Sequence, residues 1–397
     1  MKRFWNNKLF LLCWASYAAA YICRVNISSA LDKLQQSFQV SSNLLGLLGV
    51  AFFITYAAGQ LINGVAADQV SPQLYIVTAL CGTVVVNFLI SCCSNFYFIV
   101  FLWMLNGFFQ SMFWGPMMRL LSCRYSKAIS HKISIGMASS LIVGFILSWT
   151  LLGRMLLPCS WKEYFWVPAA LTMFFIPVWT ALLLRSRRNS TADAWGFAGC
   201  KERIKHSFAR LSSLNIKGIA VTCFCMGVIK ESVFYWTPLI FTRALGIKIE
   251  SSFLYIVLIP VFNFGGLFLA NSLAKKYSAD YHKTLRILFG ATGMLSTFLM
   301  ICPAGNAMVT VLLFAVVSAV ISGAHSILLS YIPLQFGNEN LVSTLVGIFD
   351  CSAYFGAAFS TYVLAGFITD SGWKMIALVW ILAAVGAFVV SLKRKEK

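Results

Sequence analysis

LFLLCWASYAAAYICRVNISSAL, residues 9–31, is an almost uninterrupted apolar stretch whose one charged residue is Arg24. About 20 predominantly apolar residues are enough for a helix to cross the hydrocarbon core of a bilayer. The stretch therefore predicts a transmembrane helix that carries a cation inside the membrane. Hydropathy over windows of about 19 residues predicts eleven further spans, at residues 44–66, 74–94, 96–121, 134–157, 163–185, 217–241, 252–275, 284–302, 307–331, 341–367 and 373–392.

The composition supports the same class of protein. Of the 397 residues, 59% are hydrophobic and 11% are charged, and the mean hydropathy is +0.80. A soluble protein carries roughly 25% charged residues, so a chain this poor in charge is expected to face lipid. The twelve cysteines are scattered without C-x-x-C spacing, which is typical of small buried side chains rather than of disulfides or a metal site. The sequence predicts an all-α membrane protein of twelve transmembrane helices with no metal and no cofactor.

The net charge of +19 would suggest a nucleic-acid partner for a soluble protein, but here the charges follow the connections between spans. With the N-terminus in the cytoplasm, 22 lysines and arginines fall in cytoplasmic segments and six on the opposite side. Cytoplasmic connections are enriched in these residues. We therefore expect a multi-pass protein of the cell (inner) membrane with both termini in the cytoplasm and no nucleic-acid partner.

Residues 185–217 are the one long, densely charged connection, and they divide the spans into six and six. Transporters of the major-facilitator type are built from two parallel six-helix repeats. The sequence thus predicts an N-terminal bundle at 1–184, a cytoplasmic connection at 185–217 and a C-terminal bundle at 218–397.

Two cations lie inside predicted spans at matching positions, Arg24 in the first helix and Lys230 in the seventh. A charge at that depth costs at least about 2.5–3.5 kcal/mol, so it needs a partner or a watery cavity. One interpretation is that the two cations clamp an anionic solute from opposite repeats. The other is that Arg24 snorkels outward or caps carbonyls while Lys230 pairs with an acid.

Several polar residues could complete such a site. Tyr17 and Tyr21 share a helical face with Arg24, and Tyr56 shares a face with Gln60 at i, i+4 spacing. Tyrosines of this kind also line helix interfaces without contacting a ligand. Gln110 in the fourth span is expected to make a hydrogen bond between helices.

Titratable groups inside the membrane are functional candidates by default. Asp350 in span eleven could bind substrate, carry a proton or balance Lys230, and His325 is either a ligand or a satisfied packing group. Glu231 follows Lys230 directly, and since neighbours at i, i+1 do not face each other, we expect it to point to another helix or to carry a coupling proton. Asp68, at the cytoplasmic end of span two, is expected to pair with cations of the loops rather than with substrate.

Four segments together resemble the organophosphate:phosphate antiporter family of the major facilitator superfamily, along nearly the whole chain. These segments are Tyr17-x-x-x-Tyr21-x-x-Arg24-x-Asn26, Tyr56-x-x-x-Gln60-x-x-Asn63-Gly64-x-x-Ala67-Asp68-x-x-Ser71-Pro72, Asn106-Gly107-x-x-Gln110-x-x-x-Trp114-x-Pro116-x-x-Arg119 and Lys230-x-x-x-x-Tyr235-Trp236-Thr237-Pro238.

The resemblance implies that Arg24 and Lys230 hold a phosphate group, that Tyr17, Tyr21 and Tyr56 line the pocket, and that inorganic phosphate is exchanged for a phosphate ester. It also aligns Ser140 with a histidine of the fifth span. The chain departs from the family at Val25 and Gln60, where the family has cations, and Lys230 stands where arginine is usual. A lysine lacks the two-pronged guanidinium that suits phosphate oxygens, so the pocket is less cationic than the family's.

The sequence therefore predicts a monomeric secondary active transporter that moves a small organic anion, a phosphorylated sugar or polyol, by alternating access. One alternative is a proton-coupled carrier of a monoanion or neutral glycoside that uses Glu231 or Asp350 for the proton. Another is a transporter-like sensor that binds a sugar phosphate without moving it. No nucleophile–base pair, metal cluster or nucleotide loop points to an enzyme.

Overall fold

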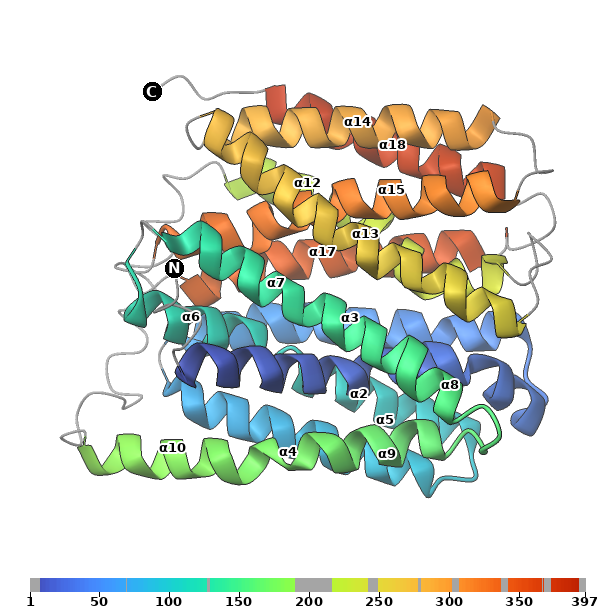
Figure 1. Cartoon of the computed structure of the whole chain (residues 1–397). Coiled ribbons are helices and arrows are strands. Elements are labelled where there is room, and N and C mark those ends of the chain that lie inside the picture. The colour runs from blue at the N-terminus through green and yellow to red at the C-terminus, as the bar shows by residue number, and fades with distance from the viewer. Residues whose placement is uncertain are drawn as a thin grey trace.

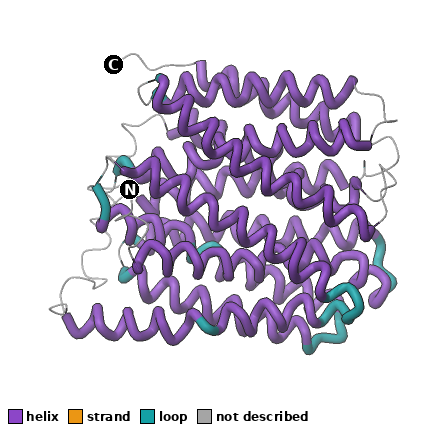
Figure 2. The backbone as a smooth tube through the Cα atoms, viewed as in Figure 1, coloured by secondary structure: helices purple, strands orange, loops and turns teal. Residues whose placement is uncertain are grey.

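A computed structural model describes residues 8–68, 70–126, 129–189, 216–241, 249–277, 280–301, 307–336, 342–365, 367 and 373–392, and its described elements are helices (Figure 1, Figure 2). In chain order they are α2 (Lys8–Phe38), α3 (Ser42–Ala67), α4 (Pro72–Ser91), α5 (Phe96–Gln110), α6 (Trp114–Arg124), α7 (Ser130–Ile146), the π-helical turn η2 (Leu147–Leu152), α8 (Gly153–Met155), α9 (Glu163–Met173), α10 (Phe175–Asn189), α12 (Ile216–Leu239), α13 (Ile249–Lys276), α14 (Tyr281–Ile301), α15 (Ala307–Ser326), the π-helical turn η4 (Ile327–Tyr331), α16 (Ile332–Leu334), α17 (Val342–Ala365) and α18 (Trp373–Leu392).

Twelve helical segments of the described chain are long and apolar enough to cross a bilayer, and each corresponds to a predicted span. The prediction of twelve transmembrane helices is therefore confirmed. The largest difference is at the first span, whose helix α2 continues to Phe38. The helices lie side by side, and α2 begins at the same end of the bundle at which α18 ends, on the left in Figure 1. We call this the N-terminal end and the other the far end.

The predicted connection at 185–217 is partly helical. Helix α10 continues to Asn189 and α12 begins at Ile216. Residues 190–215 lie outside the described part of the chain. The division into bundles at 1–184 and 218–397 stays a prediction, and below we refer to the first six spans (α2 to α10) and the last six (α12 to α18).

Buried amides tie the first six spans together. The Asn26 amide nitrogen of α2 donates to Asn87 Oδ1 of α4 (2.9 Å) and to the Tyr164 carbonyl of α9 (2.9 Å). Asn106 of α5 donates to the Cys23 carbonyl (3.0 Å). Within lipid, interhelical hydrogen bonds of this kind hold helices that hydrophobic burial alone cannot hold. They fix α2, and therefore the depth of Arg24, against three neighbouring helices.

The backbones of helices α3 and α17 approach each other very closely where the two helices cross, because glycines lie at the crossing point. A Cβ atom added to Gly347 would lie 2.4 Å from the Gln60 carbonyl oxygen and 2.9 Å from Gly64 Cα. Both distances are far shorter than a carbon can tolerate, so only glycine permits this approach. The crossing joins the first six spans to the last six.

Replacing Gly347 with alanine is therefore expected to force α3 and α17 apart. Overpacking of this kind costs about 2 kcal/mol, and we expect a lower thermal unfolding midpoint of the purified protein. The matched control is Gly265→Ala, since an added Cβ there meets nothing within 4 Å. Equal midpoints for the two variants would contradict this account of the crossing.

At the N-terminal end, side chains of the first six spans bind backbone groups of the last six. Trp114 Nε1 donates to the Leu329 carbonyl in η4 (3.1 Å), and the Ser134 hydroxyl donates to the Ser326 carbonyl (3.0 Å). A π-helical turn displaces carbonyls from the regular α-helical pattern, which makes acceptors available to a neighbouring helix. These bonds close the N-terminal end between the two sets of spans.

Asp68 provides the third contact at this end. It follows α3 directly, and its carboxylate accepts hydrogen bonds from the first turn of α17: the Ser343 N–H (3.2 Å), the Thr344 N–H (2.7 Å) and the Thr344 hydroxyl (2.8 Å). Arg119 Nε lies 3.7 Å from the same carboxylate. Asp68 thus lies beside a cation, as predicted, but that cation belongs to α6 in the fourth span and not to a loop. The contact with α17 was not predicted, and it makes Asp68 a cap for a helix of the other six spans.

Candidate functional site

Arg24 lies near the centre of the interface between the two sets of spans and is 6% exposed. Its guanidinium donates a hydrogen bond to the Tyr354 hydroxyl of α17. Aromatic rings surround it, with Tyr56 at 4.3 Å, Tyr354 at 4.8 Å and Tyr21 at 5.1 Å from the guanidinium carbon. In the described part of the chain no carboxylate pairs with Arg24 directly. The cation is thus held by aromatic faces and one hydroxyl, and it does not snorkel to the surface.

Lys230 and Glu231 form a buried ion pair, which was not expected for neighbours at i, i+1, whereas the predicted contact of Glu231 with another helix is made through Tyr354 of α17. Lys230 Nζ donates to Glu231 Oε1, although the two residues are adjacent in α12. Their Cβ atoms diverge, but the lysine side chain is long and flexible enough to curl around the helix. In a site with little water, a carboxylate is the best replacement for the hydration that the ammonium group has lost.

Tyr354 connects the two cations. Its hydroxyl accepts from Arg24 and donates to Glu231 Oε1 at 3.3 Å, the oxygen that also binds Lys230. A chain of hydrogen bonds therefore runs from Arg24 in the first six spans to Lys230 in the last six. Sequence reasoning did not single out Tyr354. Its spacing from Asp350, four residues on in the same helix, was the signal that could have found it.

Asp350 occupies a separate part of the same interface. Its Oδ2 atom accepts from Gln60 Nε2 at 2.6 Å and from the Tyr56 hydroxyl at 3.4 Å, so α3 and α17 are bridged. Gln60 also donates to the Tyr56 hydroxyl at 2.7 Å, as the i, i+4 spacing predicts. Lys230 forms its ion pair with Glu231, and no cation pairs directly with Asp350 among the described residues.

Three other predicted candidates lie outside this network. Tyr17 packs on Tyr21 and on the Trp114 ring (centroids 4.8 Å apart). The Ser140 hydroxyl donates to the Met137 carbonyl one turn back in α7. His325 is buried at 7% exposure just before η4 and has no hydrogen-bond partner within the described residues. The predicted interhelical bond of Gln110 is confirmed, since its amide donates to the Ala20 carbonyl at 2.9 Å.

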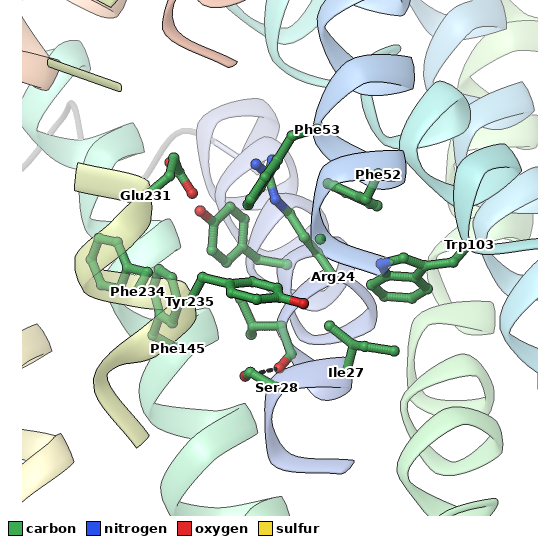
Figure 3. Close-up of a pocket in the computed structure, with 13 residues that line it drawn as sticks. Arg24, Ile27, Ser28, Phe52, Phe53, Trp103, Phe145, Glu231, Phe234 and Tyr235 are labelled. Carbon is green, nitrogen blue, oxygen red and sulfur yellow. Dashed lines mark hydrogen bonds between the residues drawn. The ribbon is translucent and has the colours of Figure 1, made fainter. Parts of the chain in front are cut away.

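A small pocket of about 40 Å³ extends from Arg24 and Glu231 toward the far end. Ligand pockets for small molecules have volumes of about 300–1,000 Å³, so this pocket has to widen before it can hold such a ligand. Figure 3 shows Phe52 and Trp103 on one side of Arg24, and Phe145, Phe234, Tyr235 and Glu231 on the other. The Phe145 and Phe234 rings stack at 4.1 Å between α7 and α12.

The pocket wall offers few free polar groups. The Tyr21 hydroxyl lines the pocket region, is buried and has no hydrogen-bond partner. Ser28 is already engaged, because its hydroxyl donates to the Val25 carbonyl and accepts from Trp149 Nε1. The site therefore combines a charged end, formed by Arg24 and Glu231, with a long aromatic wall. Sequence reasoning found the charged end and missed the wall, because aromatic residues are frequent throughout the chain.

Twelve membrane-spanning helices that enclose buried charged residues between two sets of six define an integral membrane protein with a candidate site at the level of the bilayer. Residues 13–361 match the Major Facilitator Superfamily, and the chain belongs to this family. In fold it is similar to FucP, a transporter of that superfamily in its outward conformation, with a TM-score of 0.71 and 15% identity over 98% of this chain and 99% of FucP.

Named relatives cover the chain almost end to end. It is 22% identical to a "Probable hexose phosphate transport protein" of Chlamydia muridarum (99% of this chain, 93% of the relative). It is 24% identical to the "Glycerol-3-phosphate transporter" of Bacillus subtilis (95% and 90%) and 21% identical to the "Membrane sensor protein UhpC" of Escherichia coli (96% and 90%). The predicted resemblance to the organophosphate:phosphate antiporters agrees with these relatives.

Proposed function

We propose that this protein carries a phosphorylated sugar or polyol across the membrane by alternating access, in exchange for inorganic phosphate. The observation that carries the proposal is the chain of hydrogen bonds that links Arg24 to Lys230, from opposite sets of spans, through Tyr354 and Glu231 beside the pocket. Cations that converge in this way suit the oxygens of a phosphate group. The names of the relatives support the same substrate class.

The two sets of spans move against each other in the proposed cycle. A phosphate group between Arg24 and Lys230 draws the sets together, and the hydrogen bonds at the N-terminal end must break before the site opens there. We place the N-terminal end in the cytoplasm, because 22 lysines and arginines lie in the segments on that side and six on the other. A single chain provides both cations, so we propose that a monomer of the inner cell membrane is sufficient.

Purified protein in phosphate-loaded vesicles tests the function. We expect uptake of labelled glucose 6-phosphate that depends on trapped phosphate, with no uptake into empty vesicles. Binding of glucose 6-phosphate without uptake would instead support a sensor, the role in the name of the UhpC relative.

A proton-coupled carrier is the second candidate, and Asp350 is the observation that favours it. This buried carboxylate has hydrogen bonds from Gln60 and Tyr56 but no paired cation among the described residues, so it is suited to take up a proton. Uptake driven by a pH gradient into vesicles without phosphate, and lost on Asp350→Asn substitution, would identify this mechanism.

The aromatic side chains of the pocket wall predict that the site prefers a phosphate ester that contains a sugar ring. Trp103 packs beside Phe52, with ring centroids 5.2 Å apart, on the wall next to Arg24. Replacing Trp103 with leucine removes an aromatic face worth about 1 kcal/mol, so the Kd for glucose 6-phosphate is expected to rise about fivefold. The Kd for inorganic phosphate, measured by calorimetry on the same variant, is the internal control and is expected to stay unchanged. A parallel rise for both ligands would show that the wall does not contact the sugar.

A further inference from the structure

Glu231 stands where an anionic ligand of the site would have to bind. It is 6% exposed, lies at the pocket wall, and one of its oxygens accepts from both Lys230 Nζ and the Tyr354 hydroxyl. Through Tyr354 it is also linked to Arg24. A phosphate oxygen that bound Lys230 at this point would need the same donors. The protein thus provides its own anion at Lys230, one hydroxyl group away from Arg24.

Lys230 already has a counter-ion in the empty site. The buried Glu231 carboxylate pairs with it directly, whereas the Asp350 carboxylate is held by Gln60 and Tyr56. A ligand anion cannot reach Lys230 while Glu231 holds it. Two anions at one buried cation repel each other strongly, because the surroundings screen charge far less than water does. The ligand must therefore displace Glu231.

Displacement is sterically possible at this position. Glu231 lines the pocket, so its side chain has open space beside it. The groups around the Glu231 carboxylate come from three helices: Lys230 on the same helix, Tyr354 on α17 and, through the Tyr354 hydroxyl, Arg24 on α2. When the ligand leaves, the carboxylate returns to the same donors. Lys230 is therefore never left buried without an anion.

We infer that Glu231 is an internal competitor of the substrate: it occupies the anion position in the empty carrier and is replaced by the substrate's anionic group during each cycle. This inference rests on the proposed function, since it assigns a role to a residue of the same site. It explains how a carrier with two converging cations releases an anion at all. It also distinguishes Glu231 from Arg24 and Lys230, because replacing either cation is expected to weaken the binding of the anionic ligand.

The Glu231→Gln variant tests the inference, with inorganic phosphate and glucose 6-phosphate as probes and calorimetry as the measurement. Because the amide cannot compete as an anion, we expect both ligands to bind at least about tenfold more tightly than to the wild-type protein. The maximal exchange rate in vesicles is expected to fall, because release no longer has a competitor. A residue with a purely structural role would not produce tighter binding together with slower exchange.

Two further variants keep the test decisive. Glu163→Gln makes the same change at an exposed residue that is bonded to Ser160, and it is expected to leave affinity and rate unchanged. Glu231→Asp retains the charge but withdraws the carboxylate from Lys230, so a smaller gain in affinity is expected. This variant provides the measurement if Glu231→Gln does not fold.

The outcomes separate the inference from the proposed function. Wild-type protein that binds phosphate, together with a folded Glu231→Gln variant that binds equally or more weakly, would overturn the inference and leave the proposed function standing. Binding that appears only in the variant would support the competitor. Binding by neither protein would overturn both.

Discussion

Replacing Arg24 with glutamine is expected to abolish transport of phosphate esters while the protein remains folded. The guanidinium is the cation of the first six spans at the pocket, and it reaches the second set only through Tyr354. Removing one partner of a buried, hydrogen-bonded charge pair costs about 2–5 kcal/mol, which corresponds to a loss in affinity of about a hundredfold or more. Calorimetry with glucose 6-phosphate and uptake by phosphate-loaded vesicles provide the measurement.

The control for this substitution is Arg154→Gln. Arg154 is exposed at the far end, in the short helix α8, and the same chemical change there is expected to leave uptake unchanged. Arg24→Lys is expected to retain part of the binding, because it keeps the charge and loses the two-pronged geometry. Uptake by Arg24→Gln at the wild-type rate would exclude Arg24 from the substrate site.

Replacing Asp68 with asparagine is expected to loosen the N-terminal end of the interface. The carboxylate accepts three hydrogen bonds from the first turn of α17, and a hydrogen bond to a charged group contributes about 1.5–3 kcal/mol. The asparagine side chain is an uncharged amide whose nitrogen cannot accept a hydrogen bond, so it replaces only part of this stabilisation. We expect the Ser343 and Thr344 amides to exchange hydrogen at least about tenfold faster, measured by mass spectrometry on peptides from the start of α17.

The matched control is Asp280→Asn. Asp280 accepts from the Lys283 N–H at 3.1 Å and so caps α14, but its contacts with other described residues stay within the last six spans. The Asp280→Asn substitution is expected to speed amide hydrogen exchange at the start of α14 and to leave amide hydrogen exchange in α17 unchanged. If α17 exchanged at the wild-type rate in Asp68→Asn, the carboxylate would not hold the two sets of spans together.

The number of spans and the positions of the two buried cations follow from sequence because both are local properties. A window of apolar residues determines whether a segment can cross a bilayer, whatever its neighbours are. The same holds for Arg24, whose depth in the first span follows from the helical rise. Contacts within one helix, such as that between Tyr56 and Gln60, could also be predicted, because i, i+4 residues share a face.

The Lys230–Glu231 pair shows why local reasoning failed elsewhere. Adjacent residues of a helix point apart in an isolated helix exposed to water, and the sequence does not show which partners each of them meets once it is buried. The tertiary structure removes the water and leaves the lysine no better partner than its own neighbour.

By itself, the sequence determined that this protein spans a membrane twelve times and that Arg24, Lys230, Glu231 and Asp350 lie inside it, because burying charge and exposing apolar surface each carry a large, local free-energy cost. Only the tertiary structure decided which acid belongs to which cation. It brought Tyr354, more than 300 residues away in the chain, onto Arg24, and it assigned Glu231 to Lys230 and Asp350 to Gln60. The Gln60–Asp350 pair depends on the crossing of α3 with α17, and a crossing depends on how two helix surfaces fit together, which no single segment encodes.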